Sequence, residues 1–399
     1  MISTLSLLTL SLFAPLSSGD RLVVFAENVY TAPGNLVEDG TVTIEDGKIV
    51  SVKGGTSPSG ADMVAHTVTA GLVDMSFRYS TNQNTVEQSD EITANARISE
   101  MLDLHARGWE RALKQGITTV AAFPYDRNVV GGMGAVLKTG GEETLEARLV
   151  KDAAFLRGAM GSLPSSGNRP SGARPGNFYA RRPTTRMGVE WAWRKAFYDA
   201  WQEEHGGEAA RPGRAELLAA LAGKTPVFVQ AWTTQDIRTT VFLAEEMAAE
   251  GMGSMRIVID AGAEAWREIG LLTRSGAAVC LPPFSSDGRT TDGAFMSWDV
   301  AAKLNEAGVP LALSAHAGFG SGNTLAEQAA YARRGGLSFD AALAAVTSVP
   351  ATLLGVSDRV GTLSKGLDAD LVLWNGKPFE LTTRPVGVVL NGASSSEQK

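Results

Sequence analysis

The chain has 399 residues, of which 44% are hydrophobic, and this size suits one large domain with a smaller one beside it. Its formal net charge of −7 gives no reason to expect a nucleic acid as a partner. The single cysteine, Cys280, excludes an intramolecular disulfide framework, and its apolar neighbours predict a thiol in the core rather than a nucleophile.

The segment from Met1 to Gly19 is rich in leucine and carries Pro15 and small residues near its end, which is typical of a signal peptide. It contains no Lys or Arg, and a frayed apolar N-terminus is the alternative. The segment is short and holds many Ser and Thr residues, which disfavours a permanent membrane anchor. We therefore expect residues 1–19 to be a signal peptide and the protein to be exported, to the periplasm or the extracellular space.

Short β-rich runs follow from Arg21 onwards. They cover residues 22–25, 29–30, 41–44 and 48–52, and the Pro-Gly and Asp-Gly pairs between them favour tight turns and hairpins. Near the other end, residues 360–374 (Val-Gly-Thr-Leu-Ser-Lys-Gly-Leu-Asp-Ala-Asp-Leu-Val-Leu-Trp) alternate turn-like and strand-like sequence. Both ends of the chain are therefore predicted to form short strands.

Between these ends, helical stretches alternate with apolar runs of strand length. Residues 98–114 and 239–250 are predicted helices, and the predicted strands are residues 117–123, 226–229, 256–259, 277–281 and 309–313. This alternation predicts right-handed β-α-β units and a parallel barrel. Residues 164–182, rich in Gly, Pro, Ser and Arg, are expected to form a long exposed loop, and a helix through Asp199 follows it.

One stretch, residues 67–80, has the sequence Thr-Val-Thr-Ala-Gly-Leu-Val-Asp-Met-Ser-Phe-Arg-Tyr-Ser. A short apolar run after a Gly that ends on an Asp is typical of a buried parallel strand. The stretch resembles the first barrel strand of the amidohydrolase superfamily, whose signature is Pro-Gly-Leu-Ile-Asp-x-His-x-His. The matching residues are Gly71, Leu72, Val73 and Asp74.

The resemblance extends over nearly the whole predicted mature chain. Residues 128–139, which we interpret as an inserted Gly-rich turn, and residues 183–188 are similar to the imidazolonepropionase-like branch, and residues 360–372 resemble the family's closing segment. This resemblance implies an α/β fold with a (β/α)8 TIM-like barrel over residues 68–358. A small β-sandwich would be formed by residues 20–67 together with residues 359–393.

In that family one or two divalent metals, Zn or another, activate water for attack on a C–N bond of an amide or cyclic amide. The ligands lie at the C-terminal ends of the barrel strands. In this chain the corresponding positions carry Ser76, Arg78, Gln230, Ala261 and His316. Arginine and alanine offer no metal ligand, and one histidine does not supply the three or four ligands that zinc needs. We therefore expect no metal cofactor.

Lys138 matches a position where some relatives carry a carbamylated lysine that bridges two metals. Its alternative role is to hold a loop or a neighbouring carboxylate. The other histidines, His66, His105 and His205, are expected to be surface or packing residues.

Three functions remain open on the sequence. The first is a pseudoenzyme, a binding or scaffold protein descended from hydrolases of non-peptide carbon–nitrogen bonds. The second is a metal-independent hydrolase of amide or cyclic amide bonds, with His316 as general base and Arg78 holding an anionic ligand. The third is a structural subunit that pairs with an active paralogue, and a homo-oligomer is also open. Arg78 needs a counter-ion, which is either Asp260 or a small carboxylate or phosphate ligand.

Overall fold

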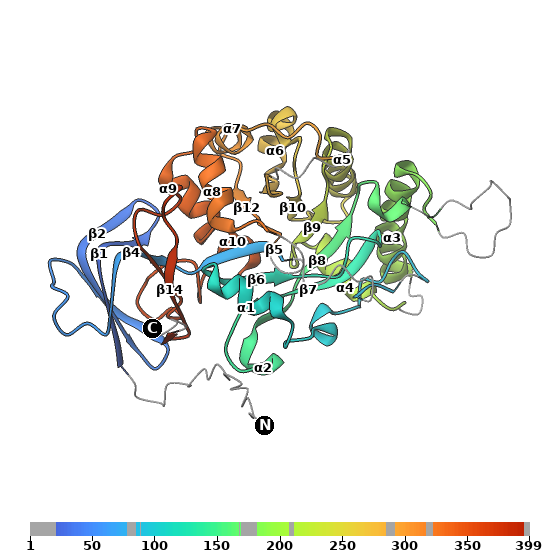
Figure 1. Ribbon diagram of the computed structural model, residues 1–399. Coiled ribbons are helices and arrows are strands. Elements are labelled where there is room, and N and C mark those ends of the chain that lie inside the picture. The colour runs from blue at the N-terminus through green and yellow to red at the C-terminus, as the bar shows by residue number, and fades with distance from the viewer. Residues whose placement is uncertain are drawn as a thin grey trace, which may run out of the picture.

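A seven-stranded sheet joins the two ends of the chain (Figure 1), in the order β15-β14-β13-β4-β1-β2-β3. The computed structural model describes residues 21–77, 85–87, 89–166, 168, 182–206, 211–284, 292–316 and 322–394. The predicted signal peptide, Arg78 and most of the predicted loop 164–182 lie outside these residues. Strands β1 (Arg21–Ala32), β2 (Asn35–Glu45), β3 (Lys48–Lys53) and β4 (Met63–Ala70) come from the N-terminal side, and β13 (Leu371–Trp374), β14 (Pro385–Leu390) and β15 (Ala393–Ser394) from the C-terminal side.

The central pairing of this sheet is between β4 and β13, which run antiparallel with Leu371 opposite Ala70 and Trp374 opposite Thr67. Val24, Val68 and Leu371 are fully buried on its apolar face. The expected pairing of the two chain ends is therefore present. The strands form one continuous hydrogen-bonded sheet, and its division into two sandwich layers stays a prediction.

Gly71 is the point at which the chain passes from this sheet into the barrel. Strand β4 ends at Ala70, and β5 (Leu72–Phe77) begins the second sheet, so the stretch predicted as one strand is two. A Cβ atom at Gly71 would lie 2.1 Å from Oγ1 of Thr118. The close approach of the neighbouring strand therefore requires glycine here.

The barrel is an eight-stranded sheet in the order β12-β11-β10-β9-β8-β7-β6-β5, and β12 lies beside β5, so that the sheet nearly closes. Besides β5, its strands are β6 (Ile117–Ala122), β7 (Val130–Lys138), β8 (Leu149–Ala159), β9 (Val227–Gln230), β10 (Ile257–Asp260), β11 (Ala278–Leu281) and β12 (Leu311–Leu313). This is a TIM-like α/β barrel, but its strands are not all parallel. Strand β7 runs antiparallel to both β6 and β8.

The prediction of an inserted Gly-rich turn at residues 128–139 was wrong, because β7 takes up most of this segment. Its glycines make room for large neighbours. A Cβ atom at Gly134 would lie 2.1 Å from Cζ of Phe155, whose ring stacks on Phe228 with centroids 4.2 Å apart. Rings and aliphatic side chains such as Val73 and Met75 fill the barrel interior, so it is a packed core rather than a channel.

Helices surround the barrel, and their bounds are α1 (Arg107–Lys114), α2 (Leu145–Arg148), α3 (Arg186–Gly206), α4 (Arg214–Leu221), α5 (Thr234–Ala249), α6 (Ile269–Ser275), α7 (Val300–Glu306), α8 (Leu325–Arg334), α9 (Phe339–Ala345) and α10 (Ser348–Leu354). The short 3-10 helices are η2 (Ile98–Met101), η3 (Leu163–Ser165) and η4 (Ala265–Arg267). The predicted helix 98–114 is thus broken into η2 and α1. Within the described ranges, no helix is both long and apolar enough to cross a membrane.

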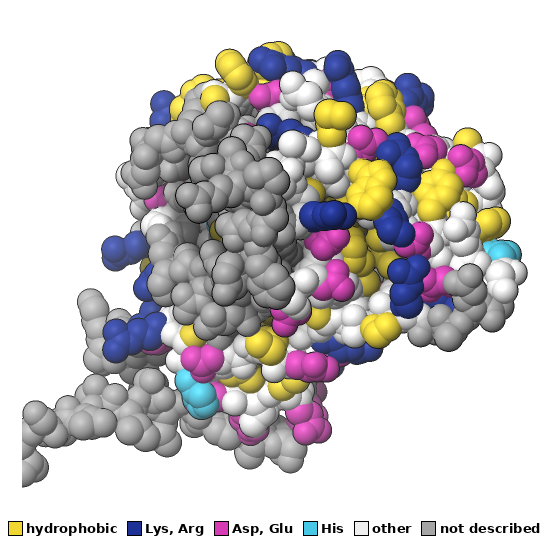
Figure 2. Space-filling view, turned by 90° about the vertical axis from the view of Figure 1, so that its right-hand side faces the viewer, with side chains coloured by type: hydrophobic (Ala, Val, Ile, Leu, Met, Phe, Trp, Pro, Cys, Tyr) yellow, Lys and Arg dark blue, Asp and Glu magenta, His cyan; other side chains and the backbone are white. Residues whose placement is uncertain are grey.

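Helix α3 covers the side of the barrel that Figure 2 presents. Its residues Trp193 and Phe197 are buried, as expected for packing, whereas Trp191 is 53% exposed. On this face the described basic and acidic side chains are interspersed rather than gathered by sign, with hydrophobic side chains among them.

Candidate functional site

Arg157, near the C-terminal end of β8, lies at the centre of a buried polar group. Its guanidinium donates from Nε to Oδ1 of Asp126 (2.6 Å) and from Nη2 to Oδ2 of Asp126 (2.8 Å). Nη2 also lies 2.7 Å from Oδ2 of Asp260. Its Cζ atom stands 3.9 Å from the ring centroid of Phe123, within the range of a cation–π contact.

Burial and the neighbouring carboxylates shift the pKa of Arg157 in opposite directions. The side chain is 1% exposed, and burial alone would lower the pKa of Arg157. The two aspartates outweigh burial, so the pKa of Arg157 is raised above its ordinary value. The side chain is therefore a permanent internal cation held by two carboxylates.

Two predicted pocket residues contact the same carboxylates. Gln230, at the end of β9, donates from Nε2 to Oδ2 of Asp126 at 2.8 Å. Ser76, near the end of β5, donates from Oγ to Oδ2 of Asp260 at 3.2 Å. Both side chains are buried. The structure therefore brings Ser76 and Gln230 together, but through a shared arginine–aspartate group.

Asp74 connects this group to the end of β12. Its carboxylate accepts hydrogen bonds from the backbone N–H of Ser76 (3.0 Å) and from Oγ of Ser314 (2.7 Å). The backbone N–H of His316 in turn donates to Oγ of Ser314 at 2.9 Å. His316 is 8% exposed, and its ring lies edge-on to Trp232 with centroids 6.4 Å apart. His316 thus adjoins the buried polar group.

Two other predicted pocket residues, Ala261 and Lys138, do not take part in this polar group. Ala261 follows Asp260 at the end of β10, where it is buried and contributes no polar side chain. Lys138 is at the opposite end of the barrel, because β7 runs antiparallel and pairs Lys138 with Thr119 at the start of β6. Its ammonium contacts Asp370 and, at 3.0 Å, Asp368. Lys138 is therefore not part of the pocket and holds neighbouring carboxylates instead.

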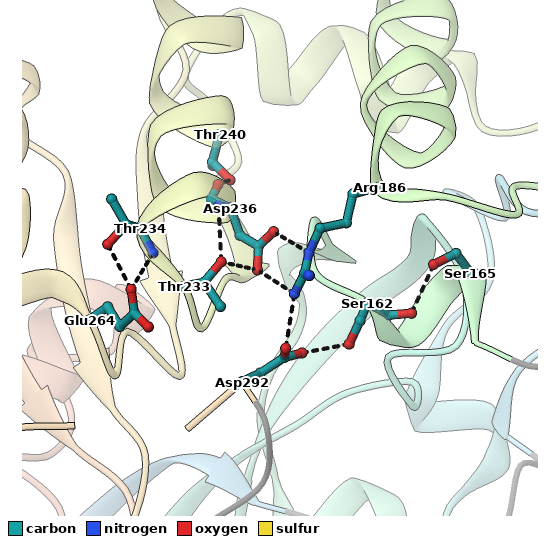
Figure 3. A network of polar contacts seen from close by, with 9 residues as sticks. All are labelled: Ser162, Ser165, Arg186, Thr233, Thr234, Asp236, Thr240, Glu264 and Asp292. Carbon is teal, nitrogen blue, oxygen red and sulfur yellow. Dashed lines mark hydrogen bonds and ion pairs between the residues drawn. The ribbon is translucent and has the colours of Figure 1, made fainter. Parts of the chain in front are cut away.

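A second polar network, centred on Arg186, lies beyond the strand ends (Figure 3). At the start of α3, Arg186 bridges two acids, with Nε 3.0 Å from Oδ1 of Asp236 and Nη2 2.9 Å from Oδ1 of Asp292. Thr233 caps α5 and donates to Oδ2 of Asp236 at 2.8 Å. Burial, the largest effect, raises the pKa of Asp236 above its ordinary value although Thr233 and Arg186 oppose the shift. This network ties α3 and α5 to the segment before α7.

The described residues at the strand ends do not fit a divalent metal. The carboxylates of Asp126 and Asp260 already face a guanidinium, and a dication would compete with Arg157 for the same oxygens and be repelled by it. In the part of the chain that the structure describes, no three His, Cys, Asp or Glu residues converge as metal ligands would. Among the described residues, a metal bound by Asp126 and Asp260 would have to displace Arg157.

Sequence reasoning missed Arg157 and Asp126. A signal for each was available: Arg157 interrupts the apolar run Ala-Ala-Phe-Leu-Arg-Gly-Ala, and Asp126 follows closely on the predicted strand 117–123. A charge within an apolar strand is usually paired.

The predicted core thiol, Cys280 on β11, is buried, which confirms that prediction. Burial, followed by Asp260 and Asp74, raises the pKa of Cys280 well above its ordinary value.

Known proteins are similar to this chain in sequence. Residues 244–394 match the family described as the Amidohydrolase family. The amidohydrolase tasK of Hapsidospora irregularis is 26% identical over 402 residues, which cover 90% of this chain and 39% of that protein. The chain therefore spans about two fifths of the length of this curated relative.

Solved structures extend the comparison. An amidohydrolase from Thermotoga maritima is similar with a TM-score of 0.81 and 25% identity, covering 94% of this chain and 100% of that chain. An adenosine deaminase from Xanthomonas campestris, solved with bound zinc, has a TM-score of 0.52 and 17% identity over 94% of this chain and 93% of that chain, which shows a common fold alone. By sequence and by structure, this chain is similar to proteins of the amidohydrolase superfamily.

Proposed function

We propose that this chain is a pseudoenzyme of the amidohydrolase superfamily, a binding or scaffold protein without metal-dependent hydrolysis. The observation that carries the proposal is the pairing of Arg157 with Asp126 and Asp260 at the strand ends. Both carboxylates neutralise an internal cation, and Ser76 and Gln230 are hydrogen-bonded to them. The carboxylates that could activate a water are therefore engaged by an internal cation and by neutral donors.

A second candidate is a metal-independent hydrolase of amide or cyclic amide C–N bonds. The position of His316 favours it, because a buried imidazole beside Trp232 at the end of a barrel strand is suited to act as a general base. This candidate shares the hydrolase ancestry of the family and differs from the first only in retaining turnover.

Metal analysis combined with a hydrolysis screen separates these functions. The purified protein should contain well under one equivalent of Zn, Mn or Fe and show no turnover of N-acyl amino acids, dipeptides or cyclic amides, with or without added metal. Metal-free turnover that disappears in His316→Ala would establish the second candidate instead. Stoichiometric metal that survives dialysis and is lost in His316→Ala would overturn the pseudoenzyme proposal.

We further propose export, and a small carboxylate or phosphate as the ligand of Arg78. Asp260 is already engaged by Arg157 and Ser76, which supports an external anion as the counter-ion of Arg78. A thermal-shift screen of small carboxylates and phosphates on wild type and Arg78→Met tests the anion proposal, and equal responses of the two proteins would reject it.

The oligomeric state is tested by light scattering. The protein measured alone tests the homo-oligomer, and the protein mixed with an active paralogue tests the paired subunit.

A further inference from the structure

The aspartates around Arg157 come from separate parts of the chain. Asp126 lies in the loop after β6 and Asp260 at the end of β10, yet both approach one guanidinium within 2.8 Å. Both are almost fully buried, at 5% and 2% exposure. Two buried carboxylates this close repel each other strongly, so the arrangement requires a cation between them.

We propose that Arg157 is a built-in cation that takes the place of a bound divalent metal and holds together the C-terminal ends of β6, β8 and β10. The inference rests on the proposed function, because it explains how the barrel keeps two converging carboxylates without a metal. The cation that this barrel uses is part of its own chain.

The geometry suits arginine in particular. Asp126 receives the guanidinium through two parallel hydrogen bonds, a fork-to-fork contact that a lysine ammonium does not reproduce. Gln230 donates to the same oxygen of Asp126 as Nη2, and Ser76 donates to the oxygen of Asp260 that faces the guanidinium. These neutral donors orient the two carboxylates without adding charge.

Chemical rescue tests the proposal. Arg157→Ala should lower Tm by several degrees, and guanidinium chloride at low millimolar concentration should restore much of the loss, because the ion fits the space left between the carboxylates. Urea, a neutral molecule of similar shape, should restore nothing. Rescue by neither compound, or equal rescue by both, would overturn the role of Arg157 as a cation.

Arg148 provides the matched control. It is also buried, at 4% exposure, but its hydrogen bonds go to the backbone carbonyls of Leu104, Gly141 and Glu142. Arg148→Ala should lose stability without rescue by guanidinium. Rescue of this variant to the same extent would show a general effect of the ion and overturn the inference.

A charge-neutral variant keeps the test decisive if Arg157→Ala does not fold. Arg157→Met with Asp126→Asn and Asp260→Asn removes all three charges and should be more stable than Arg157→Met alone. Equal stability of the two would overturn the inference. The Tm of wild type should not change with EDTA. A large loss with EDTA would defeat the proposed function as well, whereas failed rescue in a metal-free protein defeats only the inference.

Discussion

Replacing Lys138 by methionine should destabilise the connection between the barrel and the seven-stranded sheet. The lysine is 1% exposed and contacts Asp368 and Asp370, which are 4% exposed. Removing one partner of a buried ion pair costs about 3–5 kcal/mol. The lower end applies, because Asp368 keeps Lys48 and Arg359, and Asp370 keeps the backbone N–H of Asn391.

The expected shift follows from the entropy of unfolding. At about 2.1 cal/mol/K per residue, a chain of 399 residues has an unfolding entropy of about 0.8 kcal/mol/K, so a loss of about 3 kcal/mol lowers Tm by about 4 °C. Lys48→Met is the matched control, since Lys48 contacts the same Asp368 at 2.6 Å but is 50% exposed. Solvent screens the half-exposed ammonium of Lys48, so this pair should contribute about 0–1 kcal/mol and the control should shift Tm by about 1 °C or less.

The pH dependence of the stability provides a second test of the same variant. Burial opposes the ionisation of Asp368, but Lys138, Lys48 and Arg359 outweigh it and hold the pKa of Asp368 below its ordinary value. Its stabilisation is therefore complete above the unfolded pKa of about 3.9 and is lost as the pH falls through the folded pKa. Calorimetry at pH 7 and in acid should show the wild-type advantage over Lys138→Met shrinking in acid. A shift at pH 7 no larger than that of Lys48→Met would refute the reasoning.

Two further predictions concern the barrel interior. Because burial raises the pKa of Cys280, a thiol reagent at pH 8 should label one equivalent only after unfolding, and rapid labelling of the native protein would contradict the buried position. Gly134→Ala should lower Tm, because the new Cβ would meet the ring of Phe155. Gly270→Ala in α6, where nothing lies within 4 Å, should leave Tm unchanged or raise it slightly, and similar losses from both substitutions would refute the packing argument.

Most of the barrel could be predicted from the sequence because apolar runs of strand length alternate with helical stretches. Strand β10 was predicted at residues 256–259 and lies at Ile257–Asp260. The direction of β7 could not be predicted in the same way. Glycine adopts turn and strand conformations alike, so a run such as Val130–Lys138 gives no local sign that it pairs with two neighbours in the opposite direction.

The residues of the candidate site were assigned by resemblance, without the arginine–aspartate group that the structure places beside them. Ser76, Gln230 and His316 were assigned because the resemblance places them where the family carries metal ligands, and the structure places them near the ends of barrel strands. Arg157 was missed because its partners, Asp126 and Asp260, are distant in sequence, and no local pattern shows which charges will meet in a folded interior. Lys138 was assigned to the pocket by resemblance alone, and the reversed strand places it elsewhere.

The pairing of β4 with β13 has a consequence for synthesis of the chain. β4 lies between β1 and β13, and β13 begins only at Leu371. Until the ribosome has released that segment, one edge of β4 exposes unpaired N–H and C=O groups, which can pair with other chains. A chain that stops before Leu371 would keep this open edge permanently, so nascent and truncated forms should aggregate far more readily than the finished protein.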